Sequence, residues 1–305
     1  MTSTKLFRPV WRKLLCLSLI VVCWISVYSQ RTYKPSSVLA TGNWYKISVT
    51  SEGVYKLDVP FLSSLGLSGN IPSSQIRIFG HSGGMLPEAN AASRIDDLEE
   101  LAIAVEDGGD GQLNGNDYIL LYSQGPNKWL KDSLNRRFVH QKNLYSDRAY
   151  YFITVGGPGK RITNQTSSPA ASVTVNSFDD RYFYEKDTIN FLSSGKEWLG
   201  EEFSSLPGRS LTRSFAIPFS SILPGQATIQ TSVVARSVNS SSRFNVSVSN
   251  QPVQQLLVPA ITTGQYDLFV REAIQTDNFI INNSTKCILN SHQCQSTQSQ
   301  SVKGS

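Results

Sequence analysis

The chain has 305 residues, 40% of them hydrophobic, and its 28 Lys and Arg residues outnumber 23 Asp and Glu residues to give a formal net charge of +5. Four of the basic residues fall in the first thirteen positions, which hold no acid, so the remainder is nearly neutral. Binding to nucleic acid or to an anionic membrane needs clustered Lys and Arg, and this even scatter gives no electrostatic case for either.

The N-terminus has the layout of a signal peptide. The basic start precedes an apolar run over 14–27, which is broken only by two serines. A membrane-spanning helix needs roughly 20 apolar residues, so the run is short for one. The sequence predicts a signal peptide over 1–29, cleavage between Ser29 and Gln30, and no transmembrane span afterwards. An uncleaved N-terminal anchor is the alternative, and export is expected in both cases.

The rest of the chain predicts an all-β, mainly antiparallel fold with two β-rich domains. The first domain is predicted over 30–165. Alternating apolar residues in Tyr45–Val49, a turn, and a second run in Val54–Leu57 indicate a β-hairpin. Further strands of the first domain are predicted at Gln75–Phe79, Leu101–Val105, Asp117–Tyr122 and Tyr150–Val155.

One short helix interrupts these strands. Asp58 is suited to cap it, with Pro60 in the first turn and Gly66 ending it in a left-handed conformation. Phe61, Leu62 and Leu65 are expected to face inward.

The stretch Asn164–Ser177 is poor in charge and rich in Ser, Thr and Ala, which favours a linker. A second domain, over 166–283, is predicted to be a β-sandwich or jelly roll, because short alternating segments recur about every ten residues. These segments are Arg213–Phe219, Ala227–Ala235, Arg243–Val248, Gln254–Val258, Gln265–Val270 and Asn278–Ile281.

Catalytic chemistry has little support in the sequence. A cysteine peptidase needs a thiolate and a histidine that shares its proton. The chain between the signal peptide and residue 284, called the body here, contains His81 and His140 but no cysteine. Two of the four cysteines are removed with the signal peptide, and the other two lie beyond residue 284. The Cys and His residues that lie close together in the mature chain are Cys287, His292 and Cys294, in a segment without other aromatic residues. The sequence therefore predicts no catalytic residue and no Cys/His metal site.

The run Gly80–Gly84 invites comparison with a serine-nucleophile turn. It lacks the G-x-S-x-G form, so its glycines are interpreted as a turn that needs positive φ. Trp44, Trp129 and Trp198 are candidate sugar-stacking platforms, although large aromatic residues in β-sandwiches are more often core.

An acidic, glycine-rich segment at Glu106–Asp117 resembles a calcium loop. It has acids early, a glycine at the sixth place and an acid at the twelfth. The third place holds glycine where an acid is usual, and Asp at the twelfth reaches a metal less easily than Glu. The candidate ligands are Glu106, Asp110, Gln112, Asn114 and Asp117. A solvated hairpin loop explains the same composition, so no cofactor is expected other than calcium at this loop.

Several blocks of the chain, in order, resemble the N-terminal region of PorU-type sortases of the type IX secretion system, which are gingipain-family cysteine peptidases. The blocks are Val38–Ile47, Gly53–Leu57, Ile76–Gly80, Gly83–Asn90, Asp96–Glu100, Asp117–Tyr122, Gln124–Pro126, Tyr145–Asp147 and Tyr150–Phe152. The resemblance runs from about Val38 to Ile281.

The resemblance implies a Bacteroidota-type protein of the periplasm, outer membrane or cell surface. Full-length relatives remove the C-terminal secretion signal of cargo and attach the cargo to anionic lipopolysaccharide. The implied partners are type IX cargo or other secretion components. The catalytic Cys and His of the family lie in a downstream caspase-like domain, and no residue here matches them, so this chain is expected to be inactive alone.

The segment 284–305 departs from the resemblance abruptly. It contains six serines and no aromatic residue, and it is predicted to be a disordered or frameshifted tail. Two other functions stay open at this point. One is a stand-alone secreted surface binding module. The other is a complete small hydrolase whose mechanism uses no cysteine between the signal peptide and residue 284.

Overall fold

The computed structural model describes residues 33–81, 83–166, 170–191, 193, 198–219, 221–282, 286–293 and 300–304, the last two through their backbone only. The predicted signal peptide and its cleavage site lie outside these residues. Strands predominate, and the described part of the chain has one short α-helix, so the all-β, mainly antiparallel class is confirmed. None of the described helices is long and apolar enough to cross a membrane.

The chain folds as two compact units. The first comprises Met1–Gly125 and Arg148–Thr163, and the second comprises Pro126–Asp147 and Asn164–Ser305. The segment Pro126–Asp147, which lies in the sequence between the two parts of the first unit, therefore belongs to the second unit.

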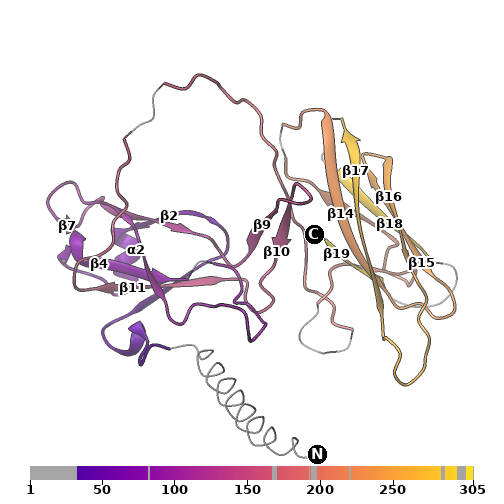
Figure 1. The fold of residues 1–305 in the computed structure, drawn as a ribbon, viewed down its shortest axis with the longest axis horizontal. Helices are drawn as coiled ribbons and strands as arrows, with labels where there is room; N and C mark the ends of the chain where they lie inside the picture. The colour runs from indigo at the N-terminus through magenta and orange to yellow at the C-terminus, as the bar shows by residue number, and fades with distance from the viewer. Residues whose placement is uncertain are drawn as a thin grey trace, which may run out of the picture. The chain divides into compact units, whose positions relative to one another are not determined.

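The first unit contains the strands β1 (Tyr45–Val49), β2 (Gly53–Asp58), β3 (Ile71–Pro72), β4 (Ile76–Gly80), β5 (Glu99–Leu101), β6 (Ala104–Glu106), β7 (Gln112–Leu113), β8 (Tyr118–Ser123) and β11 (Ala149–Val155), with the helices η2 (Val38–Ala40), α2 (Val59–Ser64) and η3 (Ser73–Gln75). The strands form antiparallel sheets in the orders β1-β11-β4-β5, β2-β8-β6 and β3-β7 (Figure 1). Apolar side chains from the two larger sheets share one core, in which Ile78, Ile119 and Ile153 are fully buried.

The predicted hairpin in this unit is wrong. β1 pairs with β11 and β2 pairs with β8, so the two neighbouring runs belong to different sheets. The predicted strand Leu101–Val105 is likewise divided between β5 and β6, with the fully buried Ile103 between them. Alternation indicates that a segment is half-buried and extended, but it does not specify the partner strand.

Helix α2 forms where it was predicted. Asp58 is the N-cap, and its carboxylate accepts the Phe61 N–H at 2.9 Å. Gly66 follows the helix at φ +94°, the left-handed conformation that glycine adopts without strain. Leu62 is buried, but Phe61 is 38% exposed and does not face inward as expected.

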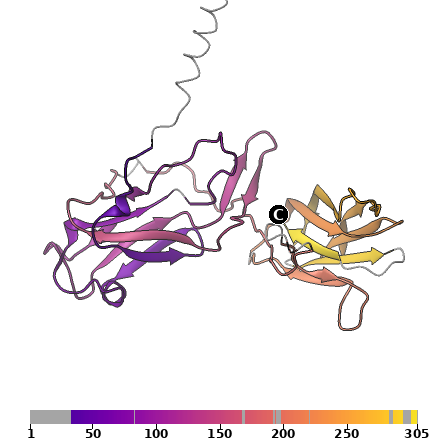
Figure 2. The same ribbon diagram turned by 90° about the horizontal axis from the view of Figure 1, so that it is seen from below.

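The second unit contains β9 (Lys128–Asp132), β10 (Arg137–Gln141), β12 (Glu202–Phe203), β13 (Thr212–Ala216), β14 (Gly225–Ala235), β15 (Ser242–Val248), β16 (Gln251–Val258), β17 (Arg271–Ile281), β18 (Lys286–Gln293) and β19 (Gln300–Gly304). Two four-stranded sheets, β12-β19-β14-β17 and β13-β18-β15-β16, form two layers in Figure 2. Apolar residues of both sheets fill the space between them, including Phe203, Val233, Phe244 and Leu256. This is the predicted β-sandwich.

A buried glutamine joins the two layers of the sandwich. Gln254 on β16 accepts the Thr231 hydroxyl at 2.6 Å and donates to the carbonyls of Ile229 and Gln275 at 3.2 and 3.1 Å. The amide group is therefore satisfied within the core, where an unpaired polar group would be costly.

Two parts of the second unit differ from what the sequence predicts. The predicted strand Gln265–Val270 is a loop, and the strand that follows it begins at Arg271. The hairpin of β9 and β10 was not predicted, because Lys128–Gln141 lacks clear apolar alternation.

The predicted tail contains two strands. β18 pairs with β13 and β15, and β19 pairs with β12 and β14, so both lie inside the sheets. A disordered tail does not describe these two segments. Cys287, Ile288 and Leu289 give β18 an apolar start that suits a strand. A frameshift near Asn283 stays a prediction.

Candidate functional site

Among the described residues, no cysteine side chain is available to pair with His81 or His140. His140 lies on β10, and the described side chains include no cysteine. Cys287 lies in β18, of which only the backbone is described, and Cys294 lies outside the described residues. The sequence expectation of no catalytic residue stays a prediction.

His140 is held among aromatic rings. Its ring stacks on Phe183 with centroids 3.6 Å apart, and it meets Trp129 edge-on at 4.9 Å. Burial lowers the pKa of His140 to about 4, with a smaller contribution from the positive charge of Lys142. Its buried Nδ1 has no hydrogen-bond partner among the residues that the structure describes. A base with so low a pKa is poorly matched to catalysis at neutral pH, so His140 acts here as a neutral packing residue.

This packing fixes the β9–β10 hairpin to the segment 181–187 of its own unit. The Arg181 guanidinium lies over the rings of Phe138 and Trp129, 4.4 and 5.4 Å from their centroids. Lys142 forms ion pairs with Asp187 at 2.5 Å and Glu185 at 3.5 Å. The sequence pattern missed this arrangement, because its residues are about 45 positions apart and carry no motif.

The predicted calcium loop closes the β6–β8 hairpin, with Glu106 opposite Tyr118 in the ladder. Asp110 accepts the Gln112 N–H at 2.8 Å and the Asn114 side-chain amide at 3.0 Å. Asp117 accepts the Asn114 N–H at 2.8 Å. Four of the five candidate ligands therefore lie in one hydrogen-bonded turn.

The carboxylates of this loop are engaged with the protein itself. Asp107, which was not among the candidate ligands, accepts the Ser73 hydroxyl at 2.5 Å and the Gly109 N–H at 3.0 Å, and these donors hold its pKa below the usual value. Gly111, at the sixth place, has φ +78°, as both a calcium loop and a tight hairpin loop require. Within the described residues, no group of three or more His, Cys, Asp or Glu side chains is arranged to hold a metal. Calcium binding stays a prediction.

The glycines after His81 have the positive φ that the turn interpretation requires. Gly83 and Gly84 have φ +69° and +68°. A Cβ on Gly83 would lie 2.5 Å from the Cβ of Gln124, so no larger residue fits there. Ser82 lies outside the described residues.

Two of the three tryptophans are engaged in packing. Trp44 meets Phe79 edge-on at 5.2 Å and donates its Nε1–H to the Thr41 carbonyl at 2.7 Å. Trp129 lies in the cluster around His140. Trp198 is 42% exposed. Sugar stacking on these tryptophans stays a prediction.

The fold is similar to that of a known protein. The crystal structure of dimeric latent PorU from Porphyromonas gingivalis matches this chain with a TM-score of 0.66 and 23% sequence identity. The match covers 88% of this chain and 24% of the PorU chain, so this chain spans about a quarter of the length of that protein. The likeness shows that the two chains share a fold.

A structure of infectious bursal disease virus Gx strain also matches, with a TM-score of 0.19 and 11% identity, covering 90% of this chain and 74% of that one. A similarity that distant carries no argument. No protein-family profile and no curated protein matches the sequence.

Proposed function

We propose that this chain is the non-catalytic N-terminal portion of a PorU-like sortase of the type IX secretion system. The observation that carries the proposal is the structural match over 88% of the chain to a region that makes up about a quarter of PorU. The ordered sequence blocks from Val38 to Tyr150 support the same assignment independently.

In this proposal the chain itself performs no chemistry. The two β-rich units provide a scaffold, while a separate catalytic region cleaves the C-terminal secretion signal of cargo and transfers the cargo to anionic lipopolysaccharide. Export places the protein in the periplasm, the outer membrane or the cell surface. Its partners are type IX cargo or other components of the secretion system.

Immunoprecipitation from the source cells tests this proposal. An antibody raised against residues 33–282 should recover a polypeptide several times larger than the 33.7 kDa of this chain. The recovered material should cleave a cargo C-terminal signal, and a cysteine-directed inhibitor should abolish that cleavage. The recombinant chain serves as the control and should show no cleavage. Recovery of only a chain-sized, inactive protein would contradict the proposal and favour a stand-alone binding module.

A further inference from the structure

One Asn-Gly pair occurs in the sequence, at Asn114 and Gly115. It lies in the turn between β7 and β8, and both residues are exposed. Asparagine is a thermolabile residue, because the backbone nitrogen of the next residue can attack its side-chain amide carbon. A glycine in the next position leaves that nitrogen without a bulky neighbour and gives its peptide more freedom to rotate than any other residue does. The pair is therefore a candidate for spontaneous chemical modification.

The attacking nitrogen is accessible in the structure. The Gly115 N–H donates no hydrogen bond among the described residues. A Cβ built on Gly115 would meet nothing within 4 Å, so the surroundings leave its peptide room to move. Within the described part of the chain, neither a hydrogen-bond partner nor a packed neighbour holds this nitrogen away from the Asn114 side chain.

The amide that would be lost is part of the hydrogen-bonded turn. The Asn114 Nδ2 donates to the Asp110 carboxylate at 3.0 Å, and the Asn114 backbone N–H donates to the Asp117 carboxylate at 2.8 Å. A carboxylate beside Nδ2 favours this nitrogen in a protonated, positively charged form. The Asp110 contact therefore does not oppose the departure of Nδ2 as ammonia.

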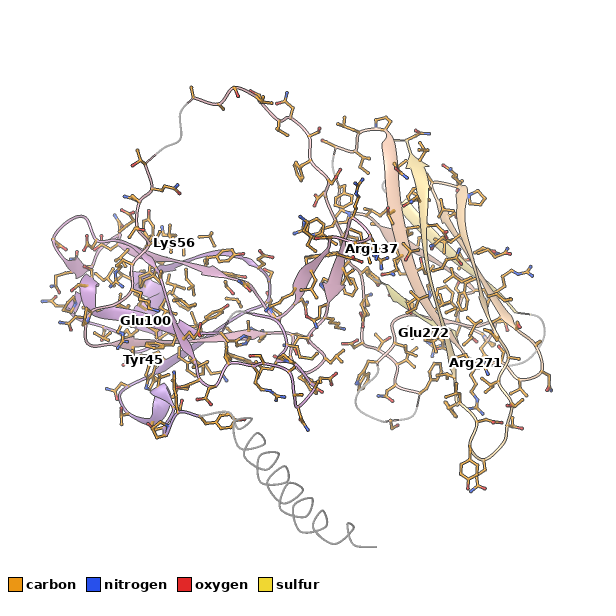
Figure 3. All side chains as sticks on the ribbon, viewed as in Figure 1. Tyr45, Lys56, Glu100, Arg137, Arg271 and Glu272 are labelled. Atoms are coloured by element: carbon orange, nitrogen blue, oxygen red, sulfur yellow. The ribbon has the colours of Figure 1, made fainter. Side chains whose placement is uncertain are left out.

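A second turn matches these surroundings closely but lacks the glycine. Asn135 lies in the turn between β9 and β10, just before Arg137, which Figure 3 labels. Its Nδ2 and its backbone N–H both donate to the Asp132 carboxylate, at 2.8 and 3.1 Å. Arg136 follows it at φ +51°, as Gly115 follows Asn114 at φ +53°. Asn135 and Arg136 are also exposed. The two asparagines thus differ mainly in the side chain of the next residue.

We propose that Asn114 is a site of spontaneous deamidation, which adds a negative charge to the loop 106–117. The Gly115 nitrogen gives its proton to solvent and attacks the Asn114 Cγ, so that a new C–N bond forms. The bond from Cγ to Nδ2 breaks, and Nδ2 takes a proton from solvent and leaves as ammonia. Water then adds to one carbonyl carbon of the cyclic imide and breaks a C–N bond of the ring, which gives aspartate or isoaspartate. This site goes beyond the proposed sortase scaffold, and its argument does not depend on that assignment.

Deamidation should loosen the turn. The nitrogen that donates to Asp110 is replaced by a carboxylate oxygen, so two like charges face each other where a hydrogen bond was. The isoaspartate product also lengthens the backbone by a methylene group, which disturbs the bond from the Asp117 N–H to the Asn114 carbonyl at 3.0 Å. Amide hydrogens of 106–117 should therefore exchange faster in the converted chain than in the fresh chain.

Peptide mass spectrometry of the full chain tests the site. The freshly purified chain is incubated at pH 8 and sampled over time, and the converted fractions at Asn114 and Asn135 are read from the same digests. We expect conversion at Asn114 to be at least about tenfold faster, which corresponds to a difference in barrier of about 1.4 kcal/mol. A lower pH should slow conversion at Asn114, because the attacking nitrogen must lose its proton.

Reciprocal substitutions separate the effect of the glycine from that of each turn. Gly115→Arg should slow conversion at Asn114 about tenfold, and Arg136→Gly should speed conversion at Asn135 about tenfold. Circular dichroism checks the fold of each variant, and Arg136→Gly tests the proposal even if Gly115→Arg does not fold. Conversion at Asn114 no faster than at Asn135, or a rate at Asn135 that Arg136→Gly leaves unchanged, would overturn the proposal. Unchanged amide exchange of 106–117 in the converted chain would overturn the loosening of the turn.

Discussion

Acid should loosen the β9–β10 hairpin through His140. The pKa of His140 is about 4 in the fold against an ordinary value of 6.5, so the folded state favours the neutral ring. The stability from this preference is fully present above pH 6.5 and is lost as pH falls towards 4. Linkage between these two pKa values gives a loss of about 2 kcal/mol at pH 5 relative to pH 8. We halve this to about 1 kcal/mol, because the ring is only half-buried and solvent screens the charge.

The variant His140→Phe keeps the stacking on Phe183 and removes the titrating group. Hydrogen–deuterium exchange of the amides in Lys128–Gln141 compares the variant with the wild type at the same pH, which cancels the intrinsic exchange rate. At pH 7.5 the variant should be protected at least as well, because the unpartnered Nδ1 is gone. At pH 5 the wild-type hairpin should lose about fivefold in relative protection. An unchanged ratio at the two pH values would refute the reasoning.

Three further predictions concern the first unit. Glu100→Gln should lower the free energy of unfolding by about 1–2 kcal/mol, measured by urea unfolding. The Glu100 carboxylate accepts the Arg77 guanidinium N–H at 2.7 Å and the Lys160 backbone N–H at 2.7 Å. An effect no larger than that of an exposed surface substitution would refute this. Gly80→Ala should lower the free energy of unfolding by about 1–3 kcal/mol, because the added Cβ would lie 2.4 Å from the Tyr151 ring. The control Gly225→Ala, whose Cβ would have nothing within 4 Å, should lower it far less. Equal losses in the two variants would contradict the predicted clash. Calcium binding at the predicted loop requires that chelation lower the melting temperature and that Asp110→Asn abolish this response; a melting temperature insensitive to chelation supports the hydrogen-bonded hairpin loop.

Local signals in the sequence predicted local structure well. Asp58 and Gly66 bound helix α2 because a cap and a left-handed glycine act within a few residues. The alternation in Gly225–Ala235 and Ser242–Val248 produced the sandwich strands for the same reason.

Long-range partners were not predictable from these signals. The two neighbouring runs β1 and β2 look like a hairpin, yet they pair with strands far along the chain. The contact of His140 with Phe183 depends on the hairpin belonging to the second unit, which composition does not indicate. Gln265–Val270 alternates like a strand, but the Gly264–Asp267 turn makes it a loop.

The candidate calcium loop was predicted from residue spacing alone. The spacing of Glu106–Asp117 fits a calcium loop in part, and the structure brings most of its polar side chains into one turn. Asp110 accepts two hydrogen bonds and Asp117 accepts one from nearby N–H groups, an arrangement that depends on the backbone path and not on residue spacing. Calcium binding there stays a prediction.

The central claim is our proposal that this chain is the non-catalytic N-terminal portion of a PorU-like sortase. The most direct measurement is the DNA sequence beyond the codon for Asn283, translated in all three forward frames. The claim predicts that one frame encodes a gingipain-like segment with a His and a Cys. Finding no such segment in any frame would contradict it.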